Sequence, residues 1–270
     1  MPKVLNTRPQ GQNQELSALL SEAGFEPVEI PLVEIIPLES GLQKLKLLQP
    51  SGYTGIFLSS PNGLRQMQNE LGQKFETWMQ KPFFLVGGKS KTLIEKLGGK
   101  VEFFPREASV SGFLKEFAFE SVTQIKPNGM VYSQRWLHPC SEATKLNPSD
   151  FKQRGIELDN IPVYRPEAPS GLQEKLVAEF PDCEALIFCS TSAVQHFFTA
   201  IPKLTDEIKS KQNKLILSIG PSTTQALNDC GIKNVHVATE ANNIGLVEAL
   251  KAVYSISETK LIKKNHEEKS

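Results

Sequence analysis

The chain has 270 residues, of which 39% are hydrophobic and 22% charged, and its 30 Lys and Arg balance its 30 Asp and Glu. This length allows two modest domains or one large one, with the composition of an ordinary globular protein. A net charge of zero excludes general attraction to nucleic acid or to an acidic membrane surface, so any anion site has to be local. No apolar run reaches the ~18 to 20 residues that span a bilayer, and no signal-peptide pattern precedes the first strand. We therefore expect a cytoplasmic protein that contacts neither membrane nor nucleic acid.

Strand and helix patterns alternate along the chain. Short apolar segments rich in β-forming residues predict buried parallel strands at residues 4–7, 55–59, 83–87, 101–105, 130–133 and 187–191. Amphipathic patterns predict helices at residues 13–24, 89–99, 222–231 and 243–253. Such alternation implies an α/β fold, with parallel sheets covered by helices on both faces.

The chain also matches itself at a nearly constant spacing. Gly24 matches Gly155 and Pro31 matches Pro162 at one spacing, and Gly87, Gly98 and Gly112 match Gly220, Gly231 and Gly245 at a spacing only two positions longer. In the same way IFLSS at 56–60 matches IFCST at 187–191, and VLNTR at 4–8 matches VYSQR at 131–135. So many matches at a similar spacing indicate an internal duplication.

Proline-rich segments at 30–38 and 161–169 occupy equivalent places in the two copies. Because proline cannot donate to a β-ladder, such segments suit edges and crossovers, and we interpret them as connectors between two bodies. The expected architecture is two similar parallel-sheet, flavodoxin-like domains. Their limits are 1–33 with 168–258 for a discontinuous outer domain, 37–163 for a middle domain, 34–36 and 164–167 for the connector strands, and 259–270 for a polar tail. The alternative cut near residue 127 would leave both proline-rich strands inside sheets.

Four turns place small hydroxyl residues between a strand and a helix, at 58–63, 86–92, 189–194 and 219–224. A helix N-terminus has free N–H groups and a partial positive charge, so it can bind carboxylate or phosphate. For any single turn, an ordinary N-cap explains the hydroxyl better. The four together favour a binding site, because ligands of open α/β sheets bind at the carboxyl ends of the strands.

Three further side chains could take part. Tyr164 lies on the expected connector, where it is either a packed structural tyrosine or a hydrogen-bond donor to a leaving group. Arg8 and its apparent repeat mate Arg135 could clamp a carboxylate, or could be surface residues. The four cysteines and four histidines show no metal-binding spacing, and we assign them no role.

The ordered series VLNTRP, EIPLVEIIPL, FLSSPNG, VGGKSKTLIEKLG, PVYRP, FCSTSAV, SIGPSTTQAL and NNIGLVEAL resembles the uroporphyrinogen-III synthase family over about residues 3–252. The resemblance implies two α/β domains joined by a two-strand ladder and a substrate, hydroxymethylbilane, that is a linear tetrapyrrole with acetate and propionate groups. It implies loss of the terminal hydroxyl as water and ring closure with inversion of the last ring through a spiro intermediate, without cofactor or metal. The sequence shows no coiled-coil heptads and no evident exposed apolar strip, so a monomer is the default expectation, and the resemblance suggests handover of substrate from hydroxymethylbilane synthase.

The family's functional tyrosine falls on Tyr164, which becomes the catalytic candidate, and two of its hydroxyl residues fall on Ser90 and Thr223. The substrate-binding candidates are Thr7, Arg8, Ser59, Ser60, Asn62, Ser90, Ser133, Ser190, Thr191, Ser192, Gly220, Ser222 and Thr223. One region departs from the family pattern: after the strand expected at 130–133, Pro139 and Pro148 interrupt the expected helix. This departure affects the contacts assigned to Ser133 and Gln134.

Two other functions compete with this interpretation. The first is a two-domain anion-binding protein without catalysis, which does not require a tyrosine on the connector. The second is a nucleotide-using enzyme. The stretch from Leu85 to Gly99 resembles a phosphate-binding loop, but Phe83 stands where the motif needs its first glycine, and no G-x-G-x-x-G follows the first strand.

Overall fold

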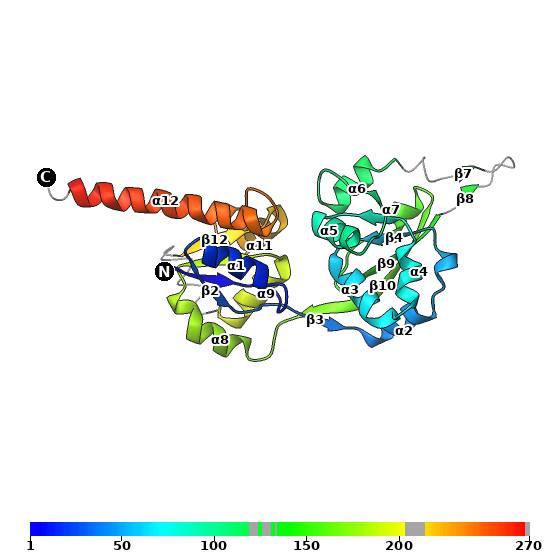
Figure 1. Cartoon of the computed structure of the whole chain (residues 1–270), viewed down its shortest axis with the longest axis horizontal. Coiled ribbons are helices and arrows are strands. Elements are labelled where there is room, and N and C mark those ends of the chain that lie inside the picture. The colour runs from blue at the N-terminus through cyan, green and yellow to red at the C-terminus, as the bar shows by residue number, and fades with distance from the viewer. Residues whose placement is uncertain (119–123, 126–130, 133, 203–213, 268–270) are drawn as a thin grey trace. The chain divides into compact units, whose positions relative to one another are not determined.

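The structure is a computed structural model and describes residues 1–118, 124–125, 131–132, 134–202 and 214–267. Contacts divide the chain into two compact units (Figure 1). Unit 1 comprises Met1–Glu34 and Glu167–Ser270, and unit 2 comprises Ile35–Pro166. This division is based on contacts between residues. It does not test whether the limits inferred from the prolines bound units that fold independently, so those limits remain a prediction.

Unit 1 contains a parallel sheet of five described strands in the order β13-β12-β11-β1-β2. Its strands are β1 (Lys3–Asn6), β2 (Glu26–Glu29), β11 (Ala185–Phe188), β12 (Leu215–Ser218) and β13 (Val235–Val237). Its helices are α1 (Gln14–Glu22), α8 (Leu172–Glu179), the 3-10 helix η3 (Phe180–Asp182), α9 (Thr191–Ala200), α11 (Pro221–Asp229) and α12 (Asn243–Glu267). This strand order is that of flavodoxin-like folds, as expected.

Both faces of the unit 1 sheet are buried, which explains why its central strand β11 is apolar throughout. On one face Val4 and Ile187 pack with Leu16 of α1 and Leu250 of α12. On the other, Phe188 packs edge-on against Phe197 of α9. Helix α12 continues to Glu267, so most of the expected polar tail forms its last turns (Figure 1). Among the described residues, no helix is long and apolar enough to cross a membrane.

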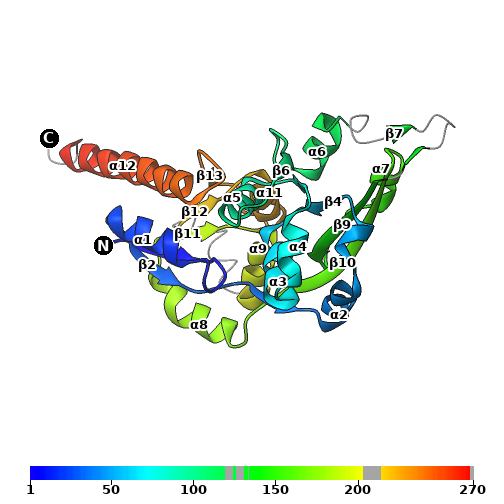
Figure 2. The same ribbon diagram turned by 45° about the vertical axis from the view of Figure 1, so that its right-hand side comes forward.

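Unit 2 contains a sheet of six described strands in the order β3-β10-β9-β4-β5-β6. Its strands are β3 (Glu34–Pro37), β4 (Gly55–Leu58), β5 (Phe83–Leu85), β6 (Val101–Phe103), β9 (Gln134–Ser141) and β10 (Ile156–Glu167), and β7 (Gln124–Ile125) pairs separately with β8 (Val131–Tyr132). Its helices are α2 (Glu39–Leu47), η1 (Pro50–Gly52), α3 (Pro61–Leu71), α4 (Lys74–Met79), α5 (Gly88–Lys96), α6 (Val110–Glu116) and α7 (Pro148–Lys152). Figure 2 shows β9 and β10 as long neighbouring strands.

The unit 2 sheet is also covered on both faces. Ile56 and Leu58 pack on one side with residues of α2, α3, α4 and α5. Phe57 and Trp136 pack on the other with Phe113 of α6 and Phe151 of α7. Helices α2 and α3 approach β10 and β9 through Gly41 and Gly63, where an added Cβ would lie 1.6 Å from the Pro162 oxygen and 2.0 Å from the Pro139 oxygen.

The strand predicted at 130–133 is not the central strand of this sheet. Val131 and Tyr132 pair antiparallel with β7, and the central position belongs to β9, which pairs with β4 through Trp136 and Leu137. Pro139 lies two residues past Leu137, the last residue of β9 that pairs with β4, so its missing N–H falls outside that paired segment. Pro148 begins α7 instead of breaking a helix, since the first helical position needs no N–H partner.

Equivalent hydrogen bonds show how the two copies correspond. The N–H of Val86 donates to Leu58 at 3.1 Å, and that of Ile219 donates to Phe188 at 3.0 Å. Val86 and Ile219 directly precede the matched glycines Gly87 and Gly220, so their acceptors Leu58 and Phe188 correspond as well. The match of 56–60 with 187–191 paired Leu58 with Cys189 and was therefore one residue out of register.

The match of VLNTR with VYSQR was further out. Gly55 pairs with Trp136, and its counterpart Ala185 pairs with Val4. Trp136 therefore corresponds to Val4, which the sequence match had paired with Val131. Counting forward from Trp136 and Val4 in step, the counterpart of Arg8 is Cys140, not Arg135.

The duplication extends to a matched helix cap. The Ser109 hydroxyl accepts a hydrogen bond from the Gly112 N–H at 2.8 Å, and the Asn242 side chain accepts one from the Gly245 N–H at 2.8 Å. Both glycines are necessary, because a Cβ would lie 2.3 Å from the Glu107 oxygen or 2.4 Å from the Glu240 oxygen. The capping residues, the glycines and the glutamates all match at one spacing, so the same backbone turn occurs in both units.

Candidate active site

Tyr164 lies in β10 within unit 2, with its ring buried in the hydrophobic cluster that includes Leu58 and Leu64. Burial raises the pKa of its hydroxyl, and a side-chain hydrogen bond with Ser60 acts in the opposite direction. Tyr164 was expected on a connector, either packed with its hydroxyl in water or acting as a donor. The ring is packed, and the hydroxyl meets Ser60 and keeps its proton at neutral pH.

The turn after β4 contributes three predicted site residues. The Ser60 hydroxyl accepts from the Asn62 N–H at 3.2 Å and so caps α3. The Asn62 side-chain oxygen accepts from Arg65 at 3.2 Å. Ser59 Oγ lies 2.8 Å from His138 Nε2. The N-cap interpretation is therefore correct for Ser60, while Ser59, which is half-buried, has a different partner.

His138 belongs to this group although the sequence indicated no role for it. Its side chain is fully buried in β9, with Nδ1 2.8 Å from Asn160 Oδ1 of β10. Burial lowers the pKa of His138 to about 4, against a smaller opposite effect of the Asn160 hydrogen bond. Aligning Trp136 with Val4 would have revealed it, because that register places His138 at the position of the buried Asn6 in β1.

The turns before α5 and α11 differ from the one before α3. Both helices begin after a glycine, Gly87 or Gly220, and neither has a side-chain cap. A Cβ at either glycine would meet nothing within 4 Å, so the space above each helix end is open. Ser90 and Thr223 are buried in the first turns, and Ser90 Oγ has no hydrogen-bond partner among the described residues. These two helix ends can accept an anion, since no side chain already caps them.

At the carboxyl end of β1, Thr7 and Arg8 differ in whether their side chains have hydrogen-bond partners among the described residues. The Thr7 hydroxyl donates to the Ile187 carbonyl at 2.6 Å, which holds the loop to β11. Arg8 is only 6% exposed, yet its Nε and Nη2 have no hydrogen-bond partner in the described part of the chain. A buried guanidinium without a counter-ion is costly, so this position is suited to a bound anion.

The remaining predicted residues are less informative. Ser190 caps α9 by accepting from the Ala193 N–H at 3.2 Å, Thr191 and Ser222 are exposed, and Ser192 is half-buried. Ser133 lies outside the described residues. Arg135 is not a free carboxylate clamp, because its Nη2 lies 2.7 Å from Asp159 and its guanidinium packs over Tyr53.

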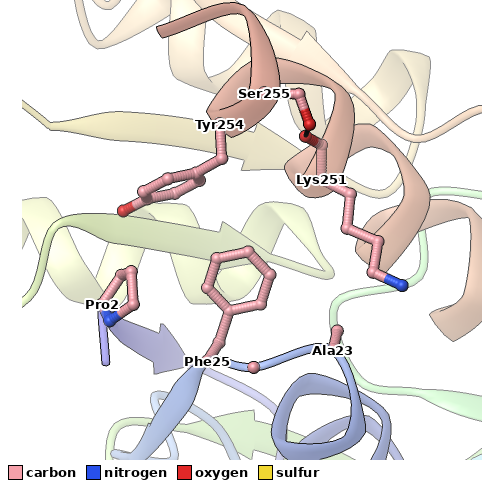
Figure 3. A pocket seen from close by; sticks show the side chains of 7 residues that line it. Pro2, Ala23, Phe25, Lys251, Tyr254 and Ser255 are labelled. Atoms are coloured by element: carbon pink, nitrogen blue, oxygen red, sulfur yellow. Dashed lines mark hydrogen bonds between the residues drawn. The ribbon is translucent and has the colours of Figure 1, made fainter. Parts of the chain in front are cut away.

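A surface pocket of about 320 Å³ in unit 1 is lined by Pro2, Ala23, Gly24, Phe25, Lys251, Tyr254 and Ser255 (Figure 3). The Tyr254 hydroxyl donates to Glu184 at 3.2 Å, and its ring packs against Phe25. Pro2 and Phe25 precede β1 and β2, so the pocket lies at the amino edge of the sheet. It is at the opposite edge from the hydroxyl-bearing turns and does not belong to the candidate site.

Fold and site together define a class: duplicated two-unit α/β proteins whose hydroxyl-bearing turns lie at the carboxyl edge of each parallel sheet. The family model described as "Uroporphyrinogen-III synthase HemD" matches residues 14–248. The chain belongs to this uroporphyrinogen-III synthase family of cyclising lyases in tetrapyrrole biosynthesis.

Relatives are similar to the chain in sequence, and solved structures are similar to it in fold. The chain is 25% identical over 230 residues to uroporphyrinogen-III synthase of Synechococcus elongatus, covering 82% of this chain and 83% of that protein. The fold is similar to mutant uroporphyrinogen III synthase of Thermus thermophilus, with a TM-score of 0.63, 16% identity and coverage of 96% and 100%. It is also similar to the Helicobacter pylori uroporphyrinogen-III synthetase, with a TM-score of 0.61, 16% identity and coverage of 95% and 100%.

Proposed function

We propose that the chain converts hydroxymethylbilane to uroporphyrinogen III by cyclising dehydration with inversion of the last pyrrole ring. The observation that carries this proposal is the family match over residues 14–248, which includes Tyr164 and the four hydroxyl-bearing turns, whereas Thr7 and Arg8 precede the matched range. We also propose that the protein acts as a cytoplasmic monomer and receives its substrate from hydroxymethylbilane synthase.

Arg8 and the two uncapped helix ends are the proposed carboxylate-binding groups. A substrate with acetate and propionate on every ring brings several negative charges to a protein with no net charge. Arg8 would gain a counter-ion through charge-assisted hydrogen bonds from Nε and Nη2, which have no hydrogen-bond partner among the described residues. The first turns of α5 and α11 would supply further donors, including the unpartnered Ser90 hydroxyl.

Tyr164 is the proposed catalytic residue. Departure of the terminal hydroxyl as water needs a proton, and a phenol that stays protonated at neutral pH can supply a hydrogen bond or that proton. The hydrogen bond with Ser60 lowers the pKa of Tyr164, so the phenol oxygen accepts it and keeps its own hydrogen for the substrate, while burial holds the ring in place. Both effects orient the donor before the substrate arrives.

The test supplies purified protein with freshly generated hydroxymethylbilane and separates the type I and type III uroporphyrins after oxidation. Without catalysis the bilane closes to type I, so a dominant type III product is the expected result. Type I alone, from protein shown to be folded, would overturn the proposal. The remaining interpretation would then be an anion-binding protein that retained the fold.

A further inference from the structure

Ser59, His138 and Asn160 form a chain of hydrogen bonds that we call the Ser59 relay. Ser59 Oγ lies 2.8 Å from His138 Nε2, and His138 Nδ1 lies 2.8 Å from Asn160 Oδ1. The three residues come from the carboxyl end of β4 and from the neighbouring strands β9 and β10. Ser59 precedes Ser60, the hydrogen-bond partner of Tyr164, so the relay ends beside the proposed catalytic group.

The donor and acceptor in each hydrogen bond of the Ser59 relay can be assigned by starting from Asn160. Asn160 Nδ2 donates to the Leu146 carbonyl at 3.3 Å, which leaves its oxygen to face His138. An amide oxygen only accepts, so His138 Nδ1 carries the hydrogen. In a neutral imidazole Nε2 is then an acceptor, and the Ser59 hydroxyl donates to it.

A serine, histidine and asparagine in this order could also suggest a nucleophile with its general base. The surroundings of His138 argue against that role. The ring is fully buried against Phe57, and its two polar partners among the described residues are uncharged, so neither of them compensates an imidazolium. His138 is instead a fixed neutral acceptor that holds the Ser59 proton.

We infer that Ser59 binds the substrate as a hydrogen-bond acceptor for a pyrrole N–H, because the relay commits its own hydrogen to His138. This inference rests on the proposed function and changes the expectation for the turn at 58–63, which was carboxylate binding by donors. Ionised carboxylates only accept, whereas pyrrole N–H groups are donors. His138 and Asn160 are positioning residues, since they act through Ser59.

The tautomer can be measured in the wild-type protein without any variant. Long-range proton–nitrogen NMR spectra of protein labelled with ¹⁵N-histidine distinguish a protonated Nδ1 from a protonated Nε2. We expect His138 to carry its hydrogen on Nδ1 at neutral pH. A hydrogen on Nε2 would make Ser59 an acceptor from His138 with its own hydrogen free, which overturns the inference.

Kinetics of four variants then test the acceptor role. We expect Ser59→Ala to lower kcat/KM for type III formation roughly tenfold, the loss of one hydrogen bond. His138→Leu should cause the same loss, because the freed Ser59 hydroxyl can rotate away, and adding it to Ser59→Ala should change nothing more. His138→Gln, whose side-chain oxygen can replace Nε2, should restore most of the activity.

Ser109→Ala is the matched control, because it removes a serine hydroxyl from unit 2 at a helix cap outside the site. Its activity per folded molecule should equal that of the wild type. The acceptor role would be contradicted if Ser59→Ala had the same kcat/KM as the wild type. It would also be contradicted if Ser59→Ala were impaired while His138→Leu kept the wild-type kcat/KM. Should His138→Leu not fold, the NMR result and Ser59→Ala decide. Failure of the proposed function is distinct, since the wild-type protein would then form only type I product.

Discussion

The two units share a backbone plan and differ in the polar side chains of one matched pair of neighbouring strands, β1 and β2 in unit 1 and β9 and β10 in unit 2. In unit 1 strand β1 places Asn6 opposite Glu29 of β2, and in unit 2 the corresponding pair is His138 of β9 and Asn160 of β10. Asn6 donates to the Asn13 carbonyl at 3.0 Å, and the Asn13 amide donates to Glu29 at 2.6 Å. The unit 1 pair therefore holds the loop that leads into α1, whereas the unit 2 pair holds Ser59.

This difference shows what duplication conserved and what changed. Strand order, the glycine-capped helices and the caps at Ser109 and Asn242 are common to both units because the backbone requires them. The buried polar positions are free to diverge as long as each polar atom finds a partner. One unit uses that freedom to secure a loop, and the other uses it to orient a site residue.

The largest expected effect is the pH dependence of stability that His138 causes in unit 2. The pKa of His138 is lowered to about 4 in the folded protein, from an unfolded value of about 6.5. Between these values only the unfolded state binds the proton, so stability is complete above pH 6.5 and falls by about 3 kcal/mol toward pH 4. The free energy of unfolding, measured by urea titration at several pH values in this range, should depend more steeply on pH in the wild type than in His138→Gln. Asn6, the unit 1 counterpart, does not titrate and contributes no such pH dependence. The same pH dependence of stability in wild type and His138→Gln would show that His138 is not a buried neutral group.

The second prediction concerns Tyr164, for which unit 1 has only an apolar counterpart. The spacing that matches Pro162 with Pro31 matches Tyr164 with Val33, which is also buried, so this position accepts a side chain without a hydroxyl. We expect Tyr164→Phe to lower kcat roughly a hundredfold if its proton assists hydroxyl departure, with little change in stability. Rate measurements and thermal unfolding on the same sample check this. Unfolding with normal activity per folded molecule would make Tyr164 a packing residue.

The third prediction uses a charge that only unit 1 carries. The counterpart of Arg8 is Cys140, a buried thiol whose pKa is raised by burial to about 11 and which is therefore neutral. Arg8→Met keeps the length of the side chain and removes its charge. We expect KM to rise roughly tenfold or more, and the free protein to be equally or more stable because an unpaired buried charge is lost. A lower stability with unchanged KM would mean that Arg8 serves the fold.

The α/β class and the duplication could be predicted from the sequence because glycines and prolines mark turns that recur in both copies. Gly112 and Gly245 are such positions, since a side chain at either would clash with backbone. The central strand of unit 2 was missed for the opposite reason. Its segment from Gln134 to Ser141 includes Pro139, which is rare in strands, and the similar endings of VLNTR and VYSQR favoured the wrong alignment.

The candidate site was only partly predictable, because hydroxyl residues after strands look alike in sequence. Ser60 and Ser190 cap their helices, while Ser90 stands in a helix that begins after a glycine, and its hydroxyl has no partner in the described part of the chain. His138 gave no local signal, because its partners Ser59 and Asn160 are 79 and 22 residues away in the chain. Such contacts depend on strand register, which a shift of a few residues changes completely.

The smallest effect tests whether the matched caps are energetically equivalent. Ser109 and Asn242 each accept one backbone hydrogen bond at 2.8 Å, so Ser109→Ala and Asn242→Ala should each cost about 1 kcal/mol. Amide hydrogen exchange can assign each loss to one unit, because α6 belongs to unit 2 and α12 to unit 1. We expect faster exchange only in the unit that carries the substitution, and additive losses in the double variant. Faster exchange in both units from a single substitution would show that they unfold together, and the comparison of two separate copies would then apply to structure but not to stability.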